Sequence, residues 1–166
     1  MAAPADPPAA GSAPWWLAGV TLPLALLGLG VSAYLTAAHY NQHVQLFCSD
    51  QGLINCASVT TSPESRFLGL PVALLGLIYF LTLPALLLPA AWRSPSRVLR
   101  TARLGAVAGG LLFVLWLVYA ELFRIGRICL YCTAVHLIVF ALFAVVSIGT
   151  ALTGPEMVDP RGTPSR

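Results

Sequence analysis

The sequence predicts an all-α integral membrane protein, a four-helix bundle with a long extracytoplasmic loop between its first and second helices. Hydrophobic residues make up 58% of the 166 residues and charged residues only 9%, roughly a third of the charge usual for a soluble domain. Four apolar stretches are each long enough to cross about 30 Å of hydrocarbon as a helix. Because none shows the period-two alternation of a barrel strand, helices are favoured.

Each span is predicted from a run rich in Leu, Ala, Val and Gly. The four spans are residues 15–38, 67–92, 104–123 and 128–150. Proline breaks the helical hydrogen-bond ladder, so we expect Pro23, Pro71 and Pro84 to kink the first two spans. Trp and Tyr residues stand near the span ends, as expected for side chains that prefer the membrane interface.

Both ends of the chain are predicted to lie outside the folded domain. Residues 1–14 are rich in Ala and Pro, and residues 151–166 contain repeated Pro and Gly. Neither segment has enough apolar surface to offset the entropy of ordering it. The first apolar run lacks a basic leader and is too long for a signal peptide, so it is expected to remain in the mature protein. We therefore expect one domain, residues 15–150, between two tails.

The arginines predict the orientation of the spans. The connection of residues 93–103 holds Arg93, Arg97, Arg100 and Arg103, and by the positive-inside rule it should face the cytoplasm. The connections of residues 39–66 and 124–127 then lie on the opposite side. The net charge of +3 thus reports orientation, and no nucleic-acid partner is expected.

All four cysteines are expected on that opposite side. They are Cys48 and Cys56 in the long connection, and Cys129 and Cys132 in the CLYC motif that opens the fourth span. On a helix, positions three apart share a face, and a CxxC spacing permits an easily reduced disulfide. The amino end of a helix favours a thiolate, and Arg124 and Arg127 are expected to add to this effect. The pattern indicates thiol–disulfide exchange between the two pairs.

Other interpretations of the cysteines remain. They can form purely structural disulfides in a transporter or an assembly factor, or a four-cysteine zinc site, although the unequal spacing argues against zinc and no metal site is expected. Attachment of haem requires CxxCH, whereas Thr133 follows Cys132. A small transporter should show more intramembrane charge than His136 and Glu121 provide.

Three further polar sites are predicted near the cysteines. His136 lies four residues beyond Cys132 and either donates a hydrogen bond to a ligand or packs in the bundle. Glu121 is expected to snorkel or to pair with Arg124 rather than to act in catalysis. The SPES segment, residues 62–65, has the signals of a helix that begins at Pro63.

Three segments, taken in order, resemble the vitamin K epoxide reductase family, specifically its bacterial homologues that form disulfides. They are CASVTTSPES from Cys56, FLGLPVALLG in the second span, and CLYC at the start of the fourth. The resemblance covers about residues 15–150. A second family of four-helix, quinone-linked oxidases carries its CxxC in the first outer loop, which is the opposite arrangement.

The resemblance implies a bundle that holds a quinone (ubiquinone, menaquinone or phylloquinone) near the outer surface. It implies that Cys132 faces the quinone, that Cys129 is its disulfide partner, and that Cys48 and Cys56 are a shuttle pair. The implied quinone site comprises Cys132, His136, Ser62, Val72 and Gly76. We place Val72 where animal members carry an asparagine, and His136 where they carry an aromatic residue.

The implied function is a quinone-dependent thiol–disulfide oxidoreductase. It would reoxidise an extracytoplasmic, DsbA-like protein of thioredoxin fold and pass the electrons through both cysteine pairs to the quinone, which supports disulfide formation in exported proteins. The implied location is the inner membrane of a bacterial cell, because a cytosolic thiol pool would continually reduce the cysteines.

Overall fold

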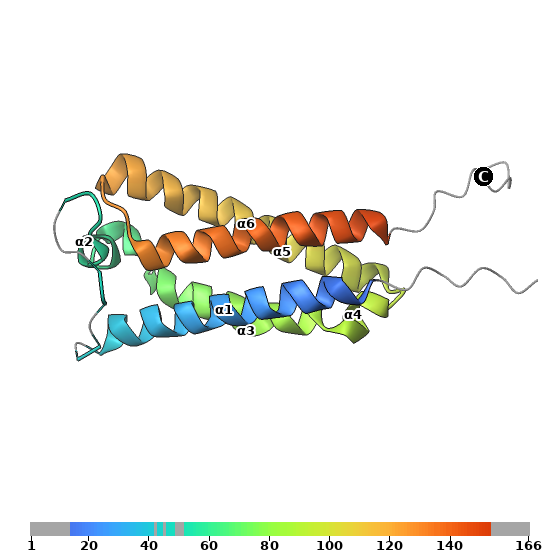
Figure 1. Cartoon of the computed structure of the whole chain (residues 1–166). Helices are drawn as coiled ribbons and strands as arrows, with labels where there is room; N and C mark the ends of the chain where they lie inside the picture. Colours follow the sequence, from blue (N-terminus) through green and yellow to red (C-terminus); the bar gives the residue numbers. More distant parts are fainter. Residues whose placement is uncertain (1–13, 42, 45, 49–51, 154–166) are drawn as a thin grey trace, which may run out of the picture.

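The computed structural model describes residues 14–41, 43–44, 46–48 and 52–153. Over these residues Figure 1 shows long helices that run along a common axis. They are α1 (Trp15–Tyr40), α3 (Val72–Leu87), α5 (Arg97–Tyr119) and α6 (Leu130–Leu152). The all-α prediction is confirmed, whereas most of both predicted tails, residues 1–13 and 154–166, lies outside the described residues.

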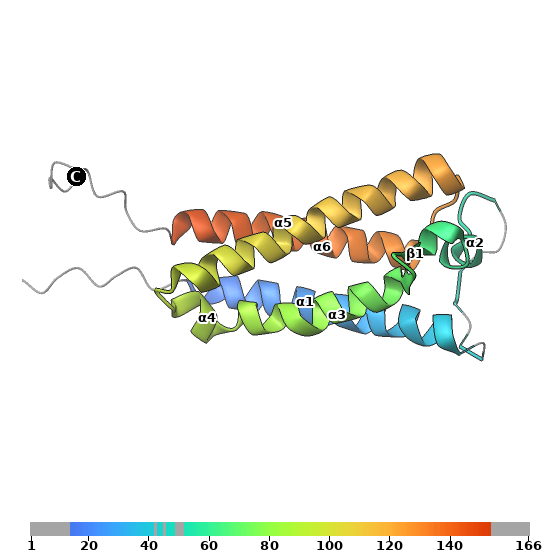
Figure 2. The same cartoon turned by 180° about the vertical axis from the view of Figure 1, so that it is seen from behind.

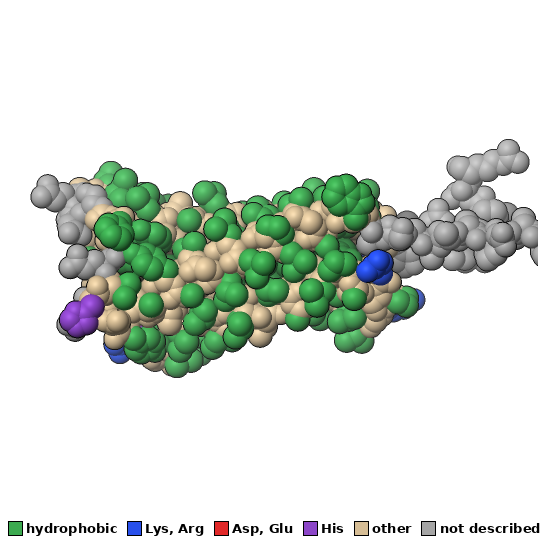
Figure 3. Space-filling model, turned by 60° about the horizontal axis from the view of Figure 1, so that its bottom comes forward, with side chains coloured by type: hydrophobic (Ala, Val, Ile, Leu, Met, Phe, Trp, Pro, Cys, Tyr) green, Lys and Arg blue, Asp and Glu red, His purple; other side chains and the backbone are tan. Residues whose placement is uncertain are grey.

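The surface of the bundle is suited to lipid. Three helical stretches in the described part of the chain are long and apolar enough to cross a membrane: Trp15–Tyr40, Arg97–Ile125 and Leu130–Leu152. Figure 3 shows one face on which hydrophobic side chains cover the body, while arginine and histidine side chains lie toward its two ends. So much exposed apolar surface is unfavourable in water and favourable in a bilayer. The protein is therefore a multi-pass membrane protein.

The second span, predicted over residues 67–92 with kinks at Pro71 and Pro84, is not a single helix in the structure. The segment begins with an antiparallel hairpin of β1 (Arg66–Phe67) and β2 (Leu70–Pro71), and its turn includes Gly69 at a φ of +84°. Pro71 does not kink a helix but precedes the first residue of α3. At 16 residues, α3 is about 24 Å long, which is shorter than the hydrocarbon core of a bilayer.

The second break in this segment is at Leu88. This residue has an extended backbone (ψ 148°), and α4 (Pro89–Arg93) begins directly after it. A residue that precedes proline is sterically disfavoured in the helical conformation, which explains why α3 ends here. Pro23 and Pro84, by contrast, do lie inside α1 and α3, as expected.

The predicted arginine-rich connection, residues 93–103, is mostly helix. Ser96 caps α5 by accepting the N–H of Leu99 at 3.5 Å, so that α5 already begins at Arg97. Arg103 is buried, and its guanidinium lies 3.6 Å from the ring centroid of Trp92. Figures 1 and 2 show α4 at the end of the bundle opposite to α2. The four arginines thus remain at one end of the protein.

Small residues allow the helices to approach closely. A Cβ atom at Gly28 of α1 would overlap the ring of Phe80 of α3, and one at Gly149 of α6 would lie 2.6 Å from Leu17 of α1. Helices in lipid gain little from the hydrophobic effect, and close packing of this kind is a main source of their association. These contacts hold α1 against both neighbours.

The opposite end, which we call the loop end, carries the remaining short elements. They are α2 (Cys56–Thr60), the single-turn 3-10 helix η1 (Pro63–Ser65) and the π-helix η2 (Ala120–Ile125), which continues α5. The helix predicted to begin at Pro63 is therefore only one turn long. The Ser62 hydroxyl does not cap it but donates to the Val59 carbonyl at 2.8 Å.

Candidate active site

Cys48 and Cys56 form a disulfide at the loop end. Cys56 is the first residue of α2, which Asn55 caps by accepting the N–H of Ser58 at 2.9 Å. Cys56 is fully buried, whereas Cys48 is partly exposed. Of the two sulfurs, that of Cys48 is therefore the more accessible to a protein that approaches from solution.

Cys129 and Cys132 are free thiols at the start of α6. The expectation that both lie on one helical face is wrong for Cys129, because this residue is the N-cap of α6 and has an extended backbone (φ −102°, ψ 117°). Its sulfur instead accepts the backbone N–H of Cys132 at 3.3 Å. The two side chains are thus brought together by a capping interaction.

The surroundings of Cys129 favour its thiolate. A hydrogen bond from the Cys132 side chain is the largest influence that lowers the pKa of Cys129, and the backbone N–H groups of Cys132 and Tyr131 act in the same direction. Arg124 and Arg127 were expected to favour the thiolate as well. In the structure Arg124 instead pairs with Glu64, and Arg127 donates to the carbonyl of Gly52. The pKa of Cys129 is therefore lowered by groups in the first turn of α6.

The fold brings the two cysteine pairs together. Cys56 and Cys129 are fully buried in one apolar cluster with Val59, and Cys48 and Cys132 pack against that cluster. An isolated parallel bridge between Ile54 and Ile128 runs beside it. The disulfide of one pair and the thiols of the other thus share a single packed region, as internal exchange requires.

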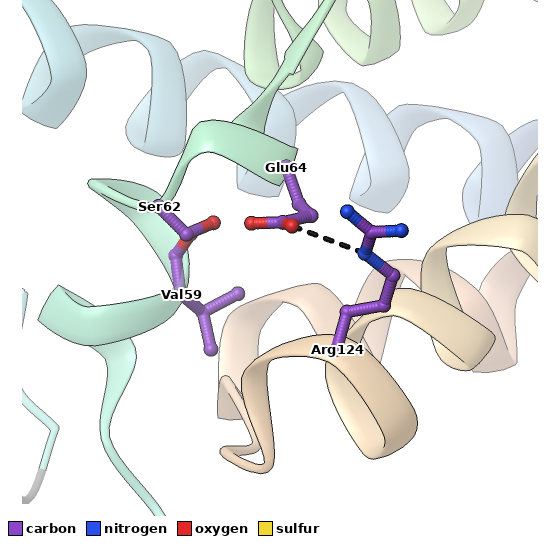
Figure 4. A network of polar contacts seen from close by, with 4 residues as sticks. All are labelled: Val59, Ser62, Glu64 and Arg124. Atoms are coloured by element: carbon purple, nitrogen blue, oxygen red, sulfur yellow. Dashed lines mark hydrogen bonds and ion pairs between the residues drawn. The ribbon is translucent and has the colours of Figure 1, made fainter.

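An ion pair joins the segment after Cys56 to the segment before Cys129. Arg124 Nε of η2 lies 3.2 Å from Glu64 Oε1 of η1, and Figure 4 shows Ser62 beside this contact. The prediction that Arg124 pairs with Glu121 is therefore wrong. With side chains 54% and 21% exposed, the pair contributes at most about 1 kcal/mol to stability, so its main effect is to position η1.

A cavity of about 600 Å³ lies among the long helices, and Cys132 of the CxxC motif lines it. Its lining is mainly apolar and includes every residue of the predicted quinone site: Cys132, His136, Ser62, Val72 and Gly76. Small-molecule sites commonly have this size and an apolar lining with a few polar groups. The structure thus brings together five residues from three separate stretches of the chain.

Most of the cavity surface is apolar, but several polar side chains line it. His136 is buried, and the buried hydroxyl of Tyr79 has no hydrogen-bond partner among the described residues. Glu121 also lines the cavity and is only 6% exposed, so it does not snorkel. Sequence reasoning named neither Tyr79 nor Glu121 as a site residue. The position of Glu121 as a lone acid in an apolar stretch could have indicated a functional residue. No feature of the sequence distinguishes Tyr79 in this way.

A second hollow of about 620 Å³ lies beside the Cys48–Cys56 disulfide, and both cysteines line it. Its other walls are more polar than those of the first cavity and include His39, Thr61 and Arg66. The disulfide therefore stands between an apolar cluster on one side and a partly polar recess on the other.

Most of the chain matches the model of a known protein family. Residues 20–147, which include all four cysteines and most of every long helix, match the vitamin K epoxide reductase family.

Proposed function

Because the chain belongs to the vitamin K epoxide reductase family, we propose that it is a quinone-dependent oxidase of an extracytoplasmic thioredoxin-fold protein. The family in general couples disulfide chemistry to quinones. The observation that carries the proposal is the continuity of the site, in which buried Cys56 and Cys129 share one cluster and Cys132 lines the adjoining cavity.

The first step takes place at the recess beside Cys48. A thiolate of the reduced partner attacks the Cys48 sulfur, the Cys48–Cys56 bond breaks, and Cys56 leaves as a thiolate. The partner's second thiolate then displaces Cys48, so that the partner departs oxidised and both loop cysteines are reduced. The exposure of Cys48 and the burial of Cys56 support this order.

The second step is exchange between the pairs. The Cys56 thiolate attacks Cys129 of a Cys129–Cys132 disulfide and releases Cys132, and Cys48 then attacks Cys56 and releases Cys129 as a thiolate. The products are a loop disulfide and a reduced CxxC, the same redox state as in the structure. The lowered pKa of Cys129 makes it a good leaving group in this step.

The cavity suits a quinone. Its volume and apolar lining match a ring with a hydrocarbon tail. The Tyr79 hydroxyl and the His136 ring can donate hydrogen bonds to a quinone oxygen. A bound quinone supplies an acceptor for two electrons and two protons. Cys129 and Cys132 close their disulfide as they release the electron pair, and the apolar walls keep water from the thiols. We propose Cys132, His136, Ser62, Val72 and Gly76 as the residues that hold the quinone, which is ubiquinone, menaquinone or phylloquinone.

We propose four crossings of a bacterial inner membrane. Because α3 alone is too short to cross the bilayer, the hairpin and α4 extend it to complete the second crossing. The four arginines at the α4 end support a cytoplasmic location for that end, and the cysteines then face outward. This arrangement suits disulfide formation in exported proteins, because the reducing cytosol is kept away from the cysteines.

The function is tested with purified protein, a quinone and a reduced thioredoxin-fold protein. We expect Cys129→Ser or Cys132→Ser to abolish quinone reduction, and Cys48→Ser to block oxidation of the folded partner. A reaction without quinone controls for oxidation by air. Oxidation of the partner by Cys48→Ser at the parental rate would rule out the shuttle role, and mass spectrometry of co-purified lipids identifies the quinone.

A further inference from the structure

Glu121 is a buried acid near the CxxC thiols, and the steps proposed above give it no role. Among the groups that act on its carboxyl are the side chain of Cys132 and the backbone N–H of Cys129, and only 6% of the residue is exposed. It lines the same cavity as Cys132 and His136. Glu121 and Cys132 therefore adjoin the same space, in which a ligand would lie.

No cation neutralises Glu121 in the part of the chain that the structure describes. Arg124, one turn away, pairs with Glu64, and Arg127 donates to the Gly52 carbonyl. Other titratable or charged groups that line the cavity are His39, Glu64, Tyr79, Cys132 and His136. A buried carboxylate without a cation is costly unless neighbouring groups donate hydrogen bonds to it. Of the two groups named above, the Cys132 thiol is the one that carries a transferable proton.

We propose that Glu121 accepts the proton of the Cys132 thiol and delivers it to the oxygen of the quinone. The inference rests on the proposed function, which names the quinone as oxidant. As the Cys129 thiolate bonds to the Cys132 sulfur, the Cys132 proton passes to the Glu121 carboxylate and the electron pair passes to the quinone. Glu121 then gives this proton to a quinone oxygen and returns to the carboxylate, and the second proton comes from the aqueous side.

Glu121→Gln is the variant that tests this step. It preserves the size of the side chain, and the backbone carbonyl of Glu121 can still accept the N–H groups of Gly126 and Arg127. Proton transfer by a positioned group typically contributes a hundredfold or more, so we expect turnover to fall on the order of a hundredfold. Glu64→Gln is the matched control, since it removes a carboxyl of the same cavity that is already paired with Arg124.

A second measurement needs no quinone. The infrared difference spectrum between the dithiol and disulfide forms of the CxxC, set with a chemical dithiol and an oxidant, should contain a carboxyl band. The reason is that the Glu121 carboxylate loses the Cys132 thiol as a hydrogen-bond donor when the disulfide forms. We expect this band in the parent and in Glu64→Gln, and its loss in Glu121→Gln. A spectrum without a carboxyl band, or a band that persists in Glu121→Gln, would overturn the proposal.

The two measurements also separate this inference from the proposed function. A parent protein that reduces no quinone would remove the proposed function, whatever the infrared band shows. A parent that turns over normally but lacks the band would remove only the role of Glu121. Loss of turnover in Glu121→Gln without a band in the parent would overturn proton transfer and leave Glu121 as a structural acceptor for the Cys129 N–H.

Discussion

Asn55 and Ile128 are joined backbone to backbone, and each of them directly precedes a cysteine. The N–H of Asn55 donates to the Ile128 carbonyl at 3.0 Å, and the N–H of Ile128 donates to the Leu53 carbonyl at 2.8 Å. These two bonds form the parallel bridge between the loop and the start of α6. They fix the position of Cys56 relative to Cys129, although the two cysteines are far apart in the sequence.

Loss of this bridge should slow exchange between the cysteine pairs. Ile128→Pro removes the N–H that binds Leu53, and a backbone hydrogen bond contributes about 1 kcal/mol. If the bridge holds the pairs in reacting position, the rate of internal exchange should fall about fivefold. Ile128→Ala retains the N–H and is the control. Equal exchange rates in the two variants, measured by acid trapping and mass mapping, would mean that the bridge does not position the sulfurs.

The titration of Cys129 should depend on the side chain at position 132. Cys132→Ser retains a hydroxyl that can donate to the Cys129 sulfur, whereas Cys132→Ala removes the side-chain hydrogen bond that most lowers the Cys129 pKa. Because a lost donor destabilises the thiolate, Cys129 should ionise at higher pH in Cys132→Ala than in Cys132→Ser. With Cys48 and Cys56 oxidised, thiolate ultraviolet absorbance reports Cys129 alone. Coincident titration curves would assign the shift to the backbone.

Tyr79→Phe should weaken quinone binding and leave the ligand-free protein intact. The Tyr79 hydroxyl is buried without a partner among the described residues, so its removal breaks no internal hydrogen bond. If the hydroxyl binds a quinone oxygen, the Kd should rise about tenfold. Thermal unfolding with and without quinone measures both effects, and exposed Tyr119→Phe is the control. Equal stabilisation of parent and Tyr79→Phe by quinone would exclude the contact.

Hydropathy was sufficient to predict the fold class but not the limits of every helix. Three predicted spans agree with observed helices, because long apolar runs without breaks have one favourable structure in lipid. The second run was misread because hydropathy does not distinguish a helix from the hairpin around Gly69 or register the break at Leu88. Both features depend on local backbone sterics rather than on apolar character.

The candidate site was partly predictable from the sequence for a related reason. Residues on one helix, such as Cys132 and His136, are related by the helical repeat and could be grouped in advance. The pairing of Arg124 with Glu64 could not, because the two residues meet only after η1 folds against η2. The local rule instead suggested Glu121 as the partner, and it thereby concealed the acid that lines the cavity with Cys132.

The orientation predicts which cysteines a reagent can reach. If the arginine-rich α4 end is cytoplasmic, the loop end faces outward. Cys48 is partly exposed at the polar recess there, whereas Cys132, which is also partly exposed, lines the apolar cavity. A membrane-impermeant maleimide, added to intact cells after mild reduction, should therefore label the parent and should label Cys48→Ser much less. A cytoplasmic cysteine protein serves as the control for leakage. Labelling that appears only after lysis would reverse the orientation.

His136 provides the last prediction, because it is buried one helical turn beyond Cys132 and lines the same cavity. Quinone reduction places negative charge on an oxygen, and a preorganised donor at such a position contributes about 3 kcal/mol. The Tyr79 hydroxyl is a second donor in the cavity, so we expect His136→Leu to lower turnover only about tenfold. Leucine is similar in bulk and apolar, so the fold should be retained. Unchanged turnover at saturating quinone, in a variant with parental thermal stability, would make His136 a packing residue and leave Tyr79 as the donor.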